Sequence, residues 1–228
     1  NKYKESILNG LEWMGIKWDG EGFIQSNEAK RHKEVAYELL EKGYAFKCIC
    51  TTKELESKRL KNQKKHLSVK RLCTKCENDS KIQILNKKYC IRIKIPNDGQ
   101  FSFTDKIQGK VTIENKELDN FILLRKNGTP TYMLSVVVDD HEMKVNTLIR
   151  GDDHLNNTFK QLYIYKYLEW NIPKYAHLPL IHGRDGSKLS KRHGAIDINE
   201  FKKLGYLPQS IINNLILLSW SPKKNNEN

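Results

Sequence analysis

The chain has 228 residues, of which 40 are Lys or Arg and 27 are Asp or Glu, and its formal net charge is +13. This length sustains a buried core without covalent staples, and we expect two structural units. Such a charge is typical of a protein that binds nucleic acid, although a Lys-, Asn- and Ile-rich coding bias is an alternative explanation. The sequence has no apolar run of about 18 residues and no signal-peptide core, which excludes membrane-spanning helices within it and favours a soluble, cytoplasmic protein.

The first third of the chain predicts helices separated by one strand. Apolar residues at steps of four, four and three predict an amphipathic helix over residues 1–18. A second helix is expected over residues 25–43, where a Gly ends it, and a short strand over residues 44–50. A Thr-x-x-Glu capping box then opens a strongly basic helix over residues 51–65.

The next segment is rich in short strands. Residues 88–95 alternate apolar side chains with Lys, Cys and Arg, which predicts a half-buried strand with a basic outer face. Further strands are expected over residues 101–103, 110–113 and 121–124. These strands, with the cysteines before them, indicate a small α+β unit over about residues 46–128.

A basic residue stands at the end of a later predicted strand. Residues 129–140 are a buried run that ends in two carboxylates, and residues 144–149 predict a strand followed by Arg150. Open α/β sheets place ligands at the carboxyl ends of their strands, and a guanidinium there can hold a carboxylate bidentately. Pairing of Arg150 with Asp152 or Asp153 is the alternative interpretation.

The last part predicts helices on either side of a basic loop. One helix is expected over residues 155–168, another begins at Asp197, and the last carries an apolar stripe at Ile211, Ile212, Leu215 and Leu218. Between them, Lys188-Leu-Ser-Lys-Arg192 crowds three cations around the hydroxyl of Ser190, beside a turn at 184–186. This loop is suited to closing over phosphate, and a solvated surface turn is the alternative.

Five cysteines, an odd number, argue against a disulfide framework and for free thiols or a metal. Two close pairs flank the basic helix and would make a tetrahedral zinc site: Cys48, Cys50, Cys73 and Cys76. His66 is an alternative to Cys76 as the fourth ligand, and a set of reduced, half-buried thiols is the alternative to a metal site. Cys90 is left over in a strand.

Several of these strings resemble those of one family. The 188–192 loop resembles the "KMSKS" signature of class I aminoacyl-tRNA synthetases, and His177-Leu-Pro-Leu-Ile181 before it resembles the glutamyl-tRNA synthetases. Gly128-Thr-Pro-Thr-Tyr132 and the Val-Val-Asp-Asp that ends at Asp140 match a string that lines the amino-acid pocket in that family. Residues 149–154 match its Ile-Arg-Gly-Glu-Asp-His string, with Asp152 in place of Glu.

The resemblance implies an α/β fold: an incomplete Rossmann-type parallel-sheet catalytic domain with an inserted α+β acceptor-binding domain and a helical stem-contact segment. Residues 1–45 and 129–187 would be the two halves of the catalytic domain. Residues 46–128 would be the tRNA acceptor-binding insert with the zinc site. Residues 188–228 would hold the signature loop and the start of the helical segment. The family's "HIGH" motif and anticodon-binding region lie outside the sequence, so we expect this piece alone to be inactive.

The resemblance also implies a reaction, in which ATP with Mg²⁺ activates L-glutamate to glutamyl-adenylate, which is transferred to the 3′ end of tRNA by a monomeric enzyme. The catalytic residues would be Lys188, Ser190, Lys191 and Arg192, and the glutamate-binding residues Tyr132, Val136 and Arg150. The ATP-binding residues would be Asp153, His154, Leu180, Ile181 and Lys191. The alternatives are a glutaminyl enzyme, an enzyme that glutamylates queuosine on tRNA, and a non-catalytic tRNA-binding module.

Overall fold

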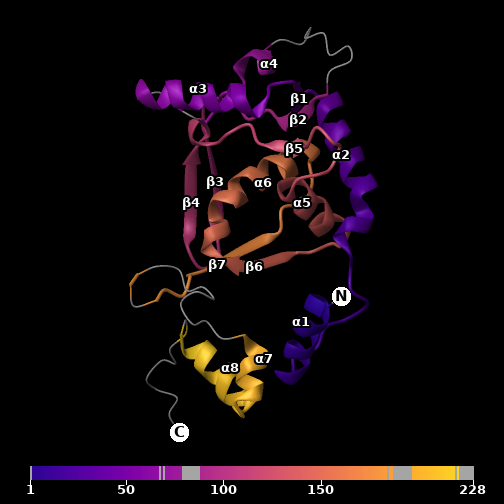
Figure 1. The fold of residues 1–228 in the computed structure, drawn as a ribbon, viewed down its shortest axis with the longest axis vertical. Coiled ribbons are helices and arrows are strands. Elements are labelled where there is room, and N and C mark those ends of the chain that lie inside the picture. Colours follow the sequence, from indigo (N-terminus) through magenta and orange to yellow (C-terminus); the bar gives the residue numbers. More distant parts are fainter. Residues whose placement is uncertain are drawn as a thin grey trace. The chain divides into compact units, whose positions relative to one another are not determined.

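A computed structural model of the protein describes residues 2–66, 68, 70–78, 88–183, 185–186, 197–218 and 220. The chain divides into two compact units (Figure 1). Unit 1 comprises Asn1–Phe23 and Leu178–Asn228, and unit 2 comprises Ile24–His177. Among the described residues, no helix has both the length and the apolarity that crossing a bilayer requires.

The first sheet of unit 2 is antiparallel and lies against a helix. Its strands are β1 (Ala45–Cys48), β2 (Cys90–Ile93) and β5 (Ile122–Leu124), in the order β1-β2-β5. The helix α2 (Ala29–Glu41) follows the short 3₁₀ helix η1 (Gln25–Glu28). The side chains of α2 that are buried recur at helical spacing, at His32, Val35, Ala36 and Leu39. The predicted helix over residues 25–43 and the predicted strands over residues 44–50, 88–95 and 121–124 are confirmed.

The second sheet combines strands that are far apart in the sequence. Its order is β4-β3-β7-β6, with β3 at Gln100–Asp105, β4 at Gly109–Glu114, β6 at Thr147–Gly151 and β7 at Lys174–Leu178. β3 and β4 form an antiparallel hairpin, whereas β3 and β7 are parallel at Asp105 and Tyr175. The fold is thus mixed α/β, as expected, and strands from the 46–128 segment share a sheet with strands that follow it.

Two helices of unit 2 complete the core around these strands (Figure 1). The helix α6 (Leu155–Leu168), which follows the 3₁₀ helix η3 (Asp152–His154), has the predicted bounds. Its aromatic residues pack edge-to-face against β3, Phe159 against Phe103 and Tyr163 against Phe101. The run over 129–140 is largely the helix α5 (Tyr132–Glu142), which buries Leu134, Val137 and Val138 at helical spacing.

The predicted strand over 144–149 is displaced towards its C-terminal end. Lys144 has a positive φ of 57° and ends the turn after α5, so the strand β6 begins only at Thr147. Arg150 consequently lies within β6 rather than beyond it.

The cysteine-bearing segment of unit 2 carries two helices, α3 (Thr52–Lys64) and α4 (Thr74–Asn78), and the short 3₁₀ helix η2 (Asn115–Glu117) lies after β4. The predicted capping box is present, because Thr51 Oγ1 accepts from the Glu54 amide at 3.2 Å and Glu54 accepts from the Thr51 amide at 2.6 Å. None of the residues of α3 is buried, which agrees with its basic composition.

Unit 1 contains the helices α1 (Lys2–Trp13), α7 (Ile198–Lys203) and α8 (Pro208–Leu217). The predicted helix over 1–18 is too long, because Gly15 adopts a positive φ of 72° and ends it. Asn199 of α7 donates to the Ser6 carbonyl of α1 at 3.1 Å, and Asp197 caps α7. Of the stripe predicted for the last helix, only Ile211 is buried, whereas Leu215 and Leu218 are exposed.

Candidate functional site

Arg150 is held by buried polar side chains from neighbouring elements of unit 2. Its Nη2 donates to Thr158 Oγ1 at 2.6 Å and to Gln161 Oε1 at 2.8 Å, both on α6. Its Nε donates to His177 Nε2 of β7 at 3.2 Å. Thr158, Gln161 and His177 are each at most 1% exposed, so water does not compete for these bonds. Among the described residues, Nη1 of Arg150 has no hydrogen-bond partner.

A buried carboxylate stands behind His177. Asp105 Oδ2 lies 2.7 Å from His177 Nδ1, and Oδ1 accepts from the backbone amides of Ile107, Gln108 and His177 at 2.9, 3.0 and 3.1 Å. Burial would raise the pKa of Asp105, but the bonds from the Gln108 amide and the His177 ring outweigh it and bring the pKa to about 2. Asp105 is therefore ionised at neutral pH.

Further polar groups surround the Arg150 side chain. Burial raises the pKa of Asp140 to about 6, and the positive charge of Arg150 partly opposes this. The guanidinium carbon of Arg150 lies 5.5 Å from the centre of the Tyr175 ring, and the Tyr175 hydroxyl is buried without a hydrogen-bond partner among the described residues. Tyr132, which is 45% exposed at the start of α5, lies with its ring centre 6.0 Å from that of His154. The Arg150 guanidinium thus lies near an aromatic ring and an acidic group.

The four predicted cysteine ligands come together at the other end of unit 2. The Sγ atoms of Cys48, Cys50, Cys73 and Cys76 all lie within 4.8 Å of one another, and His66 is not in this group. Cys73 Sγ is 3.0 Å from Cys48 Sγ and 3.2 Å from Cys50 Sγ. The hydrogen bond with Cys73 lowers the pKa of Cys48, whereas burial raises that of Cys50 to about 11. Such a set of sulfurs can hold a tetrahedral metal.

The fifth cysteine corrects the interpretation of strand 88–95. Cys90 is only 4% exposed, and its thiol donates to the Cys48 carbonyl at 3.5 Å. The face of β2 that was predicted to be basic and open to solvent is therefore covered here by the cysteine cluster. Arg92, on the same face, is half-buried and donates to the Asn120 carbonyl at 2.8 Å.

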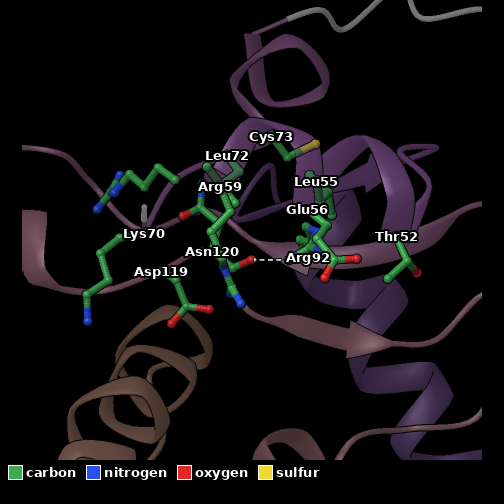
Figure 2. A pocket seen from close by; sticks show the side chains of 11 residues that line it. Thr52, Leu55, Glu56, Arg59, Lys70, Leu72, Cys73, Arg92, Asp119 and Asn120 are labelled. Carbon is green, nitrogen blue, oxygen red and sulfur yellow. Dashed lines mark hydrogen bonds between the residues drawn. The ribbon is translucent and has the colours of Figure 1, made fainter. Parts of the chain in front are cut away.

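A cavity of about 570 Å³ lies beside the cysteines (Figure 2). Its basic lining residues are Arg59, Lys70, Arg71 and Arg92, and its acidic ones are Glu56 and Asp119. Asp119 is already paired with Lys160 at 2.6 Å, so the basic side chains exceed the available carboxylates. This wall of unit 2 is suited to an anionic partner.

The comparison with known families covers the whole chain. The family described as "tRNA synthetases class I (E and Q), catalytic domain" has a model that matches residues 1–228. The chain belongs to this family.

Curated members of the class I synthetase family include close relatives of this chain. It is 48% identical to glutamate–tRNA ligase 1 of Beijerinckia indica over 219 residues, which are 95% of this chain and 46% of the relative. It is also 48% identical to glutamate–tRNA ligase 2 of Zymomonas mobilis over 217 residues, 95% of this chain and 45% of the relative. The chain therefore spans about half the length of the curated relatives it matches.

Solved synthetase structures share the fold. A glutamate tRNA ligase from Elizabethkingia meningosepticum, determined in complex with its amino acid, has a TM-score of 0.85 and 27% identity, covering 98% of this chain and 52% of that one. A glutamate–tRNA synthetase from Elizabethkingia anophelis also has a TM-score of 0.85, at 26% identity, covering 98% of this chain and 53% of that one.

The synthetase residues predicted from the sequence fall into three groups. Tyr132, Val136, Arg150, Asp153 and His154 lie in unit 2, and Leu180 and Ile181 lie in unit 1. The signature-loop residues Lys188, Ser190, Lys191 and Arg192 lie outside the described residues.

The sequence reasoning missed the polar groups that hold Arg150. Thr158 and Gln161 belong to a helix that was interpreted only through its apolar positions, and Asp105 ends the strand β3, beyond the strand predicted over residues 101–103. Their sequence spacing could have revealed Thr158 and Gln161 as a pair, because residues three apart lie on the same face of a helix. The Asp105–His177 contact spans 72 residues, and no local pattern indicates it.

Proposed function

We propose that this chain is the catalytic region of a glutamate–tRNA ligase, which uses ATP to activate L-glutamate and transfers it to the 3′ end of tRNA. The observation that supports this most directly is the fixed guanidinium of Arg150, whose Nη1 has no partner among the described residues. The names of the curated relatives agree, and they favour the glutamyl enzyme over the glutaminyl enzyme, the queuosine-modifying enzyme and a non-catalytic module.

In the proposed reaction a carboxylate of glutamate attacks the α-phosphorus of ATP and pyrophosphate leaves, so the protein supplies no nucleophile. Arg150 forms charge-assisted hydrogen bonds with a carboxylate of glutamate, and Tyr132 and Val136 line the same pocket. Orientation of the two reactants removes much of the entropic cost of the step. Magnesium, when bound with ATP, neutralises phosphate charge.

The nucleotide side of the proposed site is assigned to two segments of the chain. Asp153 and His154 are assigned to ATP binding. The backbone of Leu180 and Ile181 is assigned the same role. The loop residues Lys188, Ser190, Lys191 and Arg192 donate to the triphosphate and stabilise the charge that develops on pyrophosphate.

We also propose that the cysteine cluster holds a structural zinc ion. Zinc–sulfur bonds of about 2.3 Å in a tetrahedral site separate the sulfurs by roughly 3.8 Å, close to the separations of the four Sγ atoms here. Zinc would join the strand β1 to the segment around α4, and so would fix one wall of the basic cavity. The segment 46–128 is proposed to contact the acceptor end of tRNA through that wall, mainly at backbone phosphates.

The test uses this chain joined to the flanking regions of the Beijerinckia indica relative, a fusion that we call the completed enzyme. We expect glutamate-dependent ATP–pyrophosphate exchange in the presence of a glutamate-accepting tRNA. Arg150→Ala should raise the KM for glutamate about 100-fold or more, because a buried charge-assisted contact is lost. Exchange that depends on glutamine instead, or no exchange with any candidate tRNA, would contradict the proposal.

A further inference from the structure

A connected set of buried polar side chains holds Arg150 in one orientation. The proposed reaction assigns these side chains no role of their own. Asp105, His177, Thr158 and Gln161 are each at most 2% exposed, and their polar atoms meet one another or Arg150 at 2.6–3.2 Å. We call these four residues the Arg150 relay. Burying so many polar groups is costly unless they find partners. His177, Thr158 and Gln161 each hydrogen-bond Arg150, and Asp105 hydrogen-bonds His177.

The hydrogen-bond pattern of the relay selects one tautomer of His177. The ionised carboxylate of Asp105 only accepts hydrogen bonds, so the hydrogen of the His177 ring lies on Nδ1. Nε2 is then a pure acceptor, as required to receive Nε–H of Arg150 at 3.2 Å. The Thr158 hydroxyl also lies 2.9 Å from Nε2, and a hydrogen on Nε2 would oppose the N–H of Arg150 at 3.2 Å. Asp105 therefore acts on Arg150 through the imidazole, without touching it.

We propose that the Arg150 relay positions the guanidinium of Arg150. It holds the guanidinium in one orientation, in which the remaining N–H groups donate hydrogen bonds to a carboxylate of the amino-acid substrate. This inference rests on the proposed function. An arginine side chain has large rotamer freedom, and fixing it before the substrate arrives removes an entropic cost from binding. His177, Thr158 and Gln161 contact Arg150 directly, and Asp105 contacts it only through His177. Because the relay acts through Arg150, its effect is expected on the affinity for glutamate.

The first experiment varies one acceptor of the relay in the completed enzyme. Thr158→Val keeps the shape of the side chain but removes the oxygen that accepts from Nη2 of Arg150. We expect the KM for glutamate to rise about 10- to 100-fold, as for a lost charge-assisted hydrogen bond, with the KM for ATP changed by less than about twofold. Thr158→Ser, which keeps the hydroxyl, should restore most of the affinity.

Tyr163→Phe is the matched control for this experiment. Its hydroxyl is also buried on α6 and hydrogen-bonds Asn115 Oδ1 at 2.5 Å, away from Arg150. The control should therefore leave both KM values unchanged even if it lowers stability. An equal rise in the KM for glutamate in Tyr163→Phe and Thr158→Val, or no rise in Thr158→Val, would overturn the inference.

The second experiment measures the tautomer directly and needs no activity. In the 228-residue chain labelled with ¹⁵N, the ring nitrogens of His177 should report a hydrogen on Nδ1 and none on Nε2. Asp105→Asn should reverse this, because the backbone amides keep the Asn carbonyl and turn its NH₂ group towards Nδ1. The completed enzyme carrying Asp105→Asn should then lose more affinity for glutamate than Thr158→Val, since Nε2–H opposes the guanidinium.

The two readouts separate failure of the inference from failure of the proposed function. Hydrogen on Nε2 of His177 in the unmodified chain would refute the relay, whatever the enzyme does. The expected tautomer, combined with an unmodified completed enzyme that shows no glutamate-dependent exchange, would refute the proposed function and the substrate assigned to the relay. The expected tautomer with a selective rise in the KM for glutamate in Thr158→Val supports both.

Discussion

Replacement of Asp105 by Asn should lower the stability of unit 2 in a pH-dependent way. The folded-state pKa of Asp105 is about 2, below the ordinary aspartate value of about 3.9, so the ionised form stabilises the fold. At 1.36 kcal/mol per pKa unit, this stabilisation is about 2 to 3 kcal/mol at pH 7. It is fully present above about pH 5, roughly half remains at pH 3, and it vanishes as the pH falls through 2.

The assay is urea unfolding at pH 7, 5, 4 and 3, followed by the fluorescence of Trp170. This residue is the single Trp of unit 2, and its ring stacks on His141 with 3.8 Å between centres, so its signal reports unfolding of that unit. The other three Trp residues are replaced by Phe in every variant.

Asp98→Asn, which alters an exposed carboxylate, is the control for nonspecific effects of charge. The stability difference between the unmodified chain and Asp105→Asn should shrink by about 1 kcal/mol between pH 7 and pH 3. A difference that is constant with pH, or one that matches Asp98→Asn, would refute the reasoning about the buried carboxylate.

Three other predictions concern stability and metal content. Asp140→Asn should stabilise unit 2 at pH 8 and lose this advantage below about pH 4. The reason is that burial raises the folded-state pKa of Asp140 to about 6, so that ionisation above this pH opposes folding. Urea unfolding at both pH values tests whether the stability difference has this sign. Thr51→Ala should cost about 1 kcal/mol by removing the capping box of α3, whereas Thr51→Ser should cost little, and equal thermal melts of the two would contradict this. Cys73→Ser should reduce the bound zinc from one ion per chain and lower the melting temperature, whereas Cys90→Ser should keep the zinc. Elemental analysis measures the zinc content of both variants, and equal zinc in the two would exclude the four-cysteine site.

The sequence by itself determined the elements whose signals are local. The helix α6 has its predicted bounds, and the capping box before α3 is present, because spacing of apolar residues and side-chain capping act within a few residues. The family strings, which are also local, led to the family that the comparisons confirm. The predicted bounds of α1 and β6 were wrong because residues with positive φ lie there, Gly15 after α1 and Lys144 before β6.

Tertiary structure alone decided the arrangement of the polar sites. The outer face of β2 was interpreted as solvent-exposed, and only folding places the cysteine cluster over Cys90. The contact of Asp105 with His177 joins two strands 72 residues apart, through the parallel pairing of β3 with β7. The spacing of apolar residues predicts which face of a helix or strand is buried, but not which other element packs against that face. Partners in a buried network are selected by the requirement that each polar group be satisfied, and that requirement applies only once the whole core has assembled.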